Sequence, residues 1–154
     1  MPDTASTAAP DVVVERTVDA TAAETWPLWT DPEQFRLWFG PDGASIPTAH
    51  FDLRPGGERV VAMTVQTPGG ERTMWFRGNH LELDAPRLLV YTETMTDEDA
   101  NPQSPETTVR VELEDLDDGR TVVRVTHHGV PADSPGASGW AMALDKLATT
   151  LATR

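Results

Sequence analysis

Residues 139–151, GWAMALDKLATTL, constrain the architecture of this protein more than any other segment. Their large apolar side chains recur at helical spacing. They are Trp140, Leu144, Leu147 and Leu151. This spacing places them on one face of a helix, which we expect to run from Asp133 to Thr153. Almost everything earlier in the chain is typical of strand, so the helix must bury that face against a sheet. A sheet that curves around the helix would leave a cavity for a small apolar ligand.

The composition is that of one acidic domain. The chain has 154 residues, enough to bury a core without disulfides, and it contains no cysteine. Its 12 basic and 25 acidic residues give a net charge of −13, which repels nucleic-acid phosphates and anionic membrane surfaces. No apolar run is long enough to cross a membrane, and the N-terminus lacks the features of a secretory signal. We therefore expect a cytoplasmic protein with no nucleic-acid partner and no membrane insertion.

The chain is expected to form one domain behind a short tail. Residues 1–10 are small and polar, which favours a disordered tail. Residues 11–154 contain neither an internal repeat nor a linker, so they are expected to form a single domain. That domain begins with residues 12–18, whose β-branched side chains predict a strand.

Two short helices are predicted after this strand. Asp19 and Thr21 can each cap a helix over residues 22–30. Asp31 is followed by a proline, and that pair is typical of a helix start. The second helix should end near Gly40, because glycine and the proline that follows it both break helices.

Six further strands are predicted, separated by turns rich in glycine, proline and aspartate. Their ranges are 46–53, 58–67, 71–83, 87–96, 106–116 and 120–128. Most of the connections have hairpin length, so the sheet should be an antiparallel meander, and the lack of a crossover helix excludes a doubly wound parallel sheet. The predicted fold class is α+β, in the order β-α-α-β6-α.

Short motifs in a fixed order carry a closer resemblance. They are WTDPE at 29–33, LWFGP at 37–41, DLRPGG at 52–57, Gly78, LELDAPRL at 81–88, GRT at 119–121, HHG at 127–129 and GW at 139–140. Together they resemble the SRPBCC (START-like) superfamily and, within it, the family of heat-shock-protein-90 ATPase activator homologues. The resemblance extends over residues 12–151. It implies the helix-grip fold, a curved seven-stranded antiparallel sheet wrapped around a long C-terminal helix, with an internal cavity.

The resemblance implies function only in outline, and three functions stay open. The first is binding of a small hydrophobic molecule, apolar, aromatic or lipid-like, in the cavity. The second is an enzyme of the cyclase or dehydratase type that uses the same cavity. The third is a chaperone-associated interaction domain that contacts a protein through the outer sheet surface. No cofactor is expected, and a homodimer is left open.

Alternation along the strands indicates which side chains face the cavity. In the strand over 87–96 we place Tyr91, Glu93 and Met95 inward, because the resembled family often has aromatic residues at the first two positions. Aromatic residues elsewhere are strong candidates, since they join an apolar body to a polar edge, although ordinary core packing is the alternative for many of them. The side chains expected to contact the ligand are Trp26, Trp38, Phe39, Phe51, Arg59, Met63, Trp75, Tyr91, Glu93, Val111, His127, Trp140 and Leu144.

Glu93 and Arg59 are the most unusual residues expected on the cavity wall. Arg59 has the same strand parity as Val61 and Met63, and Glu93 stands where the resembled family often has an apolar ring. If both lie inside, burial should raise the Glu93 pKa unless a cation is near, and Arg59 is the candidate cation. Such a pair would suit a polar ligand group or acid–base chemistry. The alternative, commoner for charged residues, is that a bulge breaks the alternation and both are solvated.

His127 is a second candidate for proton transfer near the cavity mouth. The favoured alternative is a structural histidine that is hydrogen-bonded at a strand end. His127 and His128 are adjacent in a strand and point to opposite faces, so they cannot form a metal pair. The sequence has no HExxH, CxxC or Gly-x-Ser-x-Gly motif, so we expect no metal site and assign no catalytic residue.

Two segments are expected to border the cavity. Trp38 and Phe39 end the helical insert, and we expect them to act as a gate. The loop over residues 97–105 is polar and acidic, which predicts a mobile rim.

Overall fold

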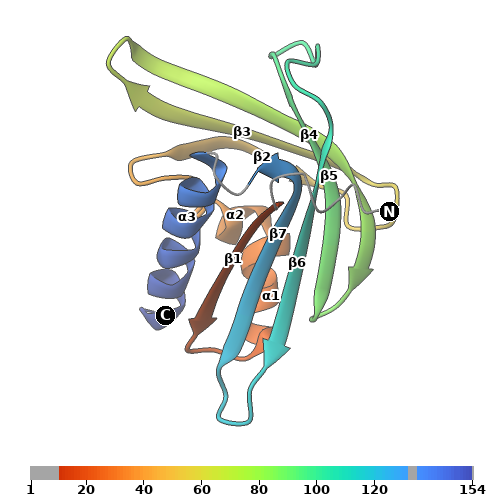
Figure 1. Cartoon of the computed structure of the whole chain (residues 1–154), viewed down its shortest axis with the longest axis vertical. Helices are drawn as coiled ribbons and strands as arrows, with labels where there is room; N and C mark the ends of the chain where they lie inside the picture. The colour runs from red at the N-terminus through yellow and green to blue at the C-terminus, as the bar shows by residue number, and fades with distance from the viewer. Residues whose placement is uncertain (1–10, 132–134, 154) are drawn as a thin grey trace, which may run out of the picture.

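A computed structural model describes residues 11–131 and 135–153. One seven-stranded antiparallel sheet forms the body of the protein, and the C-terminal helix packs on it (Figure 1). The elements are β1 (Asp11–Val18), α1 (Ala22–Thr30), α2 (Pro32–Phe35), β2 (Ser45–Phe51), β3 (Glu58–Thr67), β4 (Gly70–Asp84), β5 (Leu88–Thr96), β6 (Thr107–Asp115), β7 (Thr121–Pro131) and α3 (Pro135–Ala152). The predicted tail over 1–10 and the predicted helix start at Asp133 lie outside the described residues.

The strand order is β1-β7-β6-β5-β4-β3-β2, and every neighbouring pair is antiparallel. The meander from β2 to β7 and the helix-grip fold are therefore confirmed. The sheet bends, so that β3 and β4 run obliquely to β1, β7 and β6 (Figure 1). The place of β1 beside β7 closes the meander at that end, and this long-range pairing has no signal in local strand patterns.

N-cap residues determine where the two helices between β1 and β2 begin. Thr21 caps α1, where its hydroxyl accepts from the Glu24 N–H and the Glu24 carboxylate accepts from the Thr21 N–H. Asp31 caps α2 through the Glu33 N–H. Regular helix stops at Phe35, earlier than predicted, because the following N–H groups bond at mixed spacings in single turns as far as Phe39. These turns place the aromatic rings of this segment against the sheet.

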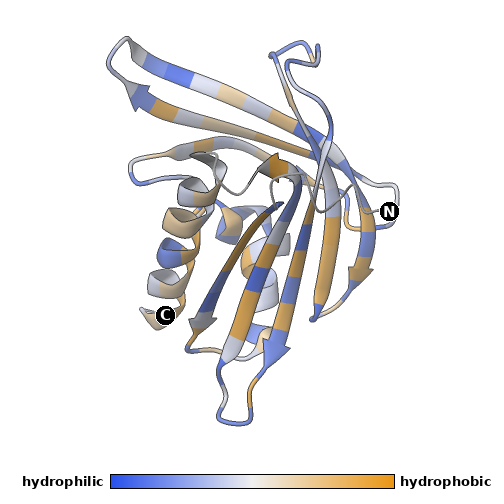
Figure 2. Ribbon diagram, in the orientation of Figure 1, coloured by the Kyte–Doolittle hydropathy of each residue, from blue (hydrophilic) through white to orange (hydrophobic). Residues whose placement is uncertain are grey.

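The apolar stripe of α3 is buried, as predicted. Its four large members are buried: Trp140, Leu144, Leu147 and Leu151. The helix packs against β1 and β7. Apolar and hydrophilic residues alternate along β6 and β7, and the side chains on the inner face are buried (Figure 2), namely Val109, Val111, Leu113, Val123, Val125 and His127. Within the described ranges, none of the helices has the length and apolarity that crossing a bilayer requires.

Candidate functional site

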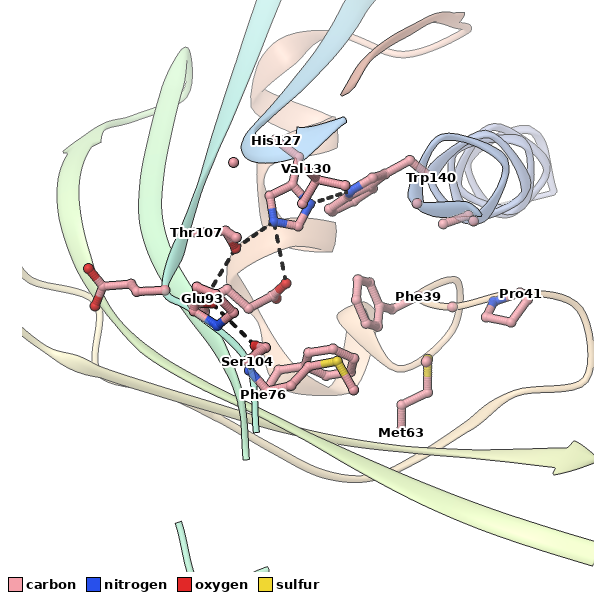
Figure 3. Close-up of a pocket in the computed structure, with 18 residues that line it drawn as sticks. Phe39, Pro41, Met63, Phe76, Glu93, Ser104, Thr107, His127, Val130 and Trp140 are labelled. Carbon is pink, nitrogen blue, oxygen red and sulfur yellow. Dashed lines mark hydrogen bonds and ion pairs between the residues drawn. The ribbon is translucent and has the colours of Figure 1, made fainter. Parts of the chain in front are cut away.

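A pocket of about 580 Å³ opens between the sheet, the start of α3 and the loop after α2 (Figure 3). Its size is typical of small-molecule sites. Aromatic and thioether side chains form much of its wall, namely Phe39, Met63, Phe76, Met95 and Trp140. The polar side chains in the lining differ in exposure: Glu93 and His127 are buried, Ser104 and Thr107 are half-buried, and Glu106 is exposed.

Small residues on α3 leave the space that the pocket occupies. Gly136, Gly139 and Ala143 line it, three and four positions apart, and therefore share one face of the helix. A Cβ atom added at Gly139 would meet no atom within 4 Å. The first turns of α3 thus stand off from the sheet, while Leu144 and Leu147 further along are in close contact with the core.

Glu93 projects from β5 and pairs with Arg59 from β3. The Glu93 Oε2 atom lies 3.6 Å from Arg59 Nη1, and both side chains are buried. Because both side chains are buried, the solvated alternative is wrong. The β3–β4 and β5–β6 ladders have no register shift, whereas the β4–β5 ladder has one between His80 and Glu82. The Arg59 guanidinium stacks over the Tyr91 ring, 3.8 Å from its centroid, and also contacts the Phe51 ring. Arg59 therefore pairs with Glu93 on the side away from the pocket, and it is not one of the residues that line the pocket.

The protein leaves Glu93 with incomplete hydrogen bonding. Its Oε2 atom has no hydrogen-bond partner in the protein, and neither has the buried Arg59 Nη2 atom. Burial raises the pKa of Glu93, and the nearby Arg59 charge offsets only part of that effect. Figure 3 shows the carboxylate extending from β5 toward His127 and Phe39.

His127 on β7 is held by two hydrogen bonds that define its tautomer. Its Nδ1 atom accepts the indole N–H of Trp140 at 3.1 Å, so Nδ1 carries no proton. Its Nε2 atom lies 2.8 Å from the Thr107 hydroxyl, which in turn donates to the backbone carbonyl of Glu93. The neutral imidazole thus donates from Nε2. Burial, the largest cause, lowers the pKa of His127 from 6.5 to about 4.

Some of the residues predicted to contact the ligand line the pocket, and the others lie outside it. Those that line the pocket are Phe39, Met63, Glu93, His127 and Trp140. Three others are buried in the core, away from the pocket: Tyr91, Val111 and Leu144. Trp26, Phe51 and Trp75 are partly buried and also lie outside the lining. Alternation indicates which face a side chain occupies, but it does not indicate how far along the strand the pocket begins.

Trp38 is fully buried in the core and does not line the pocket, so it is not part of the gate that was expected from Trp38 and Phe39. Its indole N–H donates to the Leu28 carbonyl at 2.8 Å, and its ring packs edge-on against Trp29. The neighbouring Phe39 does line the pocket and contacts the Trp140 ring. The two rings are in edge-on contact, with centroids 5.8 Å apart, but Phe39 alone of the pair lines the pocket.

The sequence reasoning missed Phe76, although the hairpin register could have identified it. The β3–β4 turn pairs Thr67 with Gly70, and the same register pairs Val61 with Phe76. Directly paired residues lie on one face of the sheet, so the inward parity of Val61 carries over to Phe76 and excludes Trp75.

The loop before β6 forms part of the rim, as expected for residues 97–105. Ser104 and Pro105 line the pocket, and the Ser104 hydroxyl accepts the Met95 N–H at 3.0 Å. The Asp97 carboxylate holds the middle of the loop by accepting from Asn101. The mobility of this rim stays a prediction. Across the described parts of the chain, no cluster of His, Asp or Glu side chains is suited to hold a metal ion.

The comparisons with known proteins agree with this architecture. A sequence model of the family described as Activator of Hsp90 ATPase homolog 1-like protein matches residues 19–152. No curated protein matches the chain. A solved protein from Nitrosomonas europaea is similar with a TM-score of 0.74 and 26% identity, over 94% of this chain and 95% of that one. An AHSA1 protein from Silicibacter pomeroyi has a TM-score of 0.76 at 21% identity, over 93% and 98%. CalU16 from Micromonospora echinospora has a TM-score of 0.63 at 23% identity, over 90% and 74%.

Proposed function

Since the chain belongs to the family of Activator of Hsp90 ATPase homolog 1-like proteins, and since its fold contains a pocket between sheet and helix, we propose that it binds a small, largely apolar molecule. The observation that carries this proposal is the lining of the pocket. Phe39, Phe76 and Trp140 present rings to it, and the glycines of α3 leave it open. Apolar walls with a few convergent polar groups are typical of small-molecule sites.

The lining of the pocket suits an aromatic or alicyclic ligand. The Phe39 and Trp140 rings are 6.0 Å apart in an edge-to-face arrangement, and Phe76 stands edge-on to Phe39 at 6.5 Å. Met63 and Met95 add thioether groups, which adapt to irregular shapes and contact ring edges favourably. Such a surface recognises rings by shape and stacking.

An acid–base reaction in the same pocket is the second candidate function. Glu93 favours it, because burial raises the pKa of its carboxyl group, as it does for carboxyl groups that act as general acids or bases. Binding and reaction are separated by Glu93→Gln. If an identified ligand still binds to this variant but is no longer converted, the protein is an enzyme; if the wild type converts no bound ligand, the carrier function stands.

The surface offers little support for the protein-interaction alternative. An exposed apolar patch on the outer sheet would be its signature. Among the residues that the structure describes, the exposed large apolar side chains lie on different elements instead: Val13, Leu37, Leu53, Leu81 and Met142. Leu37 and Met142 border one shallow hollow, but its other lining residues are polar.

A pair of substitutions at Gly139 tests the proposal. Gly139→Leu places a side chain in open space at the pocket wall, whereas Gly139→Ala adds one methyl group. Both should retain or raise stability, because glycine is about 1 kcal/mol less favourable than alanine inside a helix. The neutral fluorescent probe N-phenyl-1-naphthylamine should bind the wild type and Gly139→Ala saturably with one site.

The Leu variant should bind this probe at least about tenfold more weakly, since a filled pocket loses the apolar contacts that drive binding. Thermal unfolding of both variants serves as the control for folding. Equal probe affinity in a folded Gly139→Leu protein would contradict binding in this pocket.

A further inference from the structure

At the buried polar end of the pocket, the Glu93 carboxyl group is a hydrogen-bond acceptor without a partner among the described residues. The Glu93 side chain is 9% exposed and lines the pocket. Its Oε2 atom is enclosed on the side of Arg59 without a hydrogen-bond partner, so the accessible oxygen of the carboxyl group is Oε1, on the side of His127. Its nearest charged or polar neighbours are too distant for hydrogen bonds. Arg59 Nη1 lies 3.6 Å from Oε2, and His127 Nε2 lies 3.8 Å from Oε1. A ligand group in the pocket that donates a hydrogen bond to Oε1 would therefore give this carboxyl group a partner.

The uncharged polar side chains that line the pocket already have hydrogen-bond partners, and Glu106, the other lining carboxylate, is exposed to solvent. His127 accepts from Trp140 and donates to Thr107, and Thr107 donates to a backbone carbonyl. Both ends of this chain are chemically fixed, because an indole N–H can only donate and a carbonyl oxygen can only accept. The Ser104 hydroxyl accepts from the Met95 N–H and donates to the Pro105 carbonyl.

An anionic ligand would find no cation at this end. Arg59 does not line the pocket, and its guanidinium lies over the Tyr91 ring behind Glu93. A ligand carboxylate would therefore lie next to the Glu93 carboxylate. It would lose its hydration and be repelled by the like charge, and both effects would weaken binding. A ligand ammonium would meet the opposite difficulty, because Arg59 stands within 3.6 Å of the same carboxylate.

We propose that the pocket takes a neutral aromatic or alicyclic molecule that carries a hydroxyl group, whose O–H donates to Glu93, and that it rejects the corresponding carboxylate. This inference rests on the proposed function and names the ligand class of the same pocket. Hydrogen bonds to a charged acceptor are stronger than neutral ones, and a buried acceptor left unpaired costs free energy. Both effects favour a hydroxyl group over a methyl group of the same size.

Four probes that share a naphthalene ring and differ at its 2-position test the proposal by isothermal titration calorimetry at pH 7.5: 2-naphthol, 2-methylnaphthalene, 2-methoxynaphthalene and 2-naphthoate. We expect 2-naphthol to bind at least about tenfold more tightly than each of the others, as a single charge-assisted hydrogen bond allows. In Glu93→Gln the advantage of 2-naphthol should fall to about threefold or less. The penalty for 2-naphthoate should also shrink, because the like charge is gone.

The wild-type series decides the matter even if Glu93→Gln fails to fold. If 2-methylnaphthalene binds but 2-naphthol gains nothing, or if 2-naphthoate binds equally well, the hydroxyl inference is wrong and pocket binding stands. If 2-methoxynaphthalene matches 2-naphthol, Glu93 acts as a donor and the inference is also wrong. If none of the four probes nor N-phenyl-1-naphthylamine binds, the proposed function itself fails.

Discussion

At the residue scale, the buried pair of Arg59 and Glu93 sets the electrostatics of the pocket. Strand alternation predicted that both side chains face inward and that each is the other's partner. The cost of burial made solvation the more common expectation, and nothing in a single sequence shows the three rings that shelter the guanidinium. Those rings come from β2, β5 and α2, and only the folded chain brings them together: Phe51, Tyr91 and Phe35.

A double-mutant cycle tests whether the pair acts as a unit. Arg59→Met and Glu93→Gln should each lower the free energy of unfolding by about 3 kcal/mol, because each leaves an unpaired buried group. The double variant should lose no more than either single one, since both charges leave together. Urea unfolding at pH 7 measures all four proteins. Additive losses would mean that the two charges do not interact.

His127 makes stability depend on pH with a definite sign. The unfolded histidine takes up a proton below its ordinary pKa of 6.5, whereas the folded one does so only near pH 4. The unfolded state therefore binds more protons in this window, and the stability present above pH 6.5 is lost as the pH falls toward 4. This loss amounts to about 2–3 kcal/mol between pH 7 and pH 4.5.

The raised pKa of Glu93 acts in the opposite direction, so the wild-type profile alone is not decisive. The difference between the wild type and His127→Gln isolates the histidine. The stability advantage of the wild type over this variant should shrink by the stated amount on acidification. Chemical unfolding at several pH values provides the measurement. Parallel profiles for the two proteins would show that His127 is not kept neutral by the fold.

At the element scale, local patterns predicted most strand and helix limits. The predicted range 58–67 is that of β3, and the capping residues Thr21 and Asp31 begin α1 and α2. These features depend on neighbours in sequence, which is why they could be predicted. The position of β1 beside β7 depends on contacts between residues far apart in the sequence, so the local pattern could not indicate it.

Gly78 is where two strands approach too closely for any side chain. A Cβ atom there would lie 1.8 Å from the Thr92 carbonyl oxygen, whereas a Cβ at Gly69 would meet nothing nearer than 3.9 Å. Gly78→Ala should therefore lower the free energy of unfolding by about 3 kcal/mol, because backbone must move to relieve the clash. Gly69→Ala, the matched control in the β3–β4 turn, should lose less than about 1 kcal/mol. Equal losses in thermal or urea unfolding would contradict this packing.

At the scale of the whole molecule, the pocket exists because α3 changes character along its length. The second half of the helix carries leucines whose side chains pack in the core. The first half carries glycines, which have no side chains to fill the space beside the sheet, and that space is the pocket. The sequence predicted the helix, the sheet around it and a space between them. It did not predict the extent of that space, because Gly136 and Gly139 have no side chains whose pattern could mark a pocket wall.

The most direct test of the account is where a small molecule contacts the protein. Of the five tryptophans, Trp140 lines the pocket, while Trp75 lies beside Arg77 on β4 outside the lining. Titration with 2-naphthol, followed through the indole N–H signals in ¹H–¹⁵N NMR spectra, should shift the Trp140 signal and leave that of Trp75 unchanged. A shift confined to Trp75, or saturable binding with no change at Trp140, would contradict the proposed pocket.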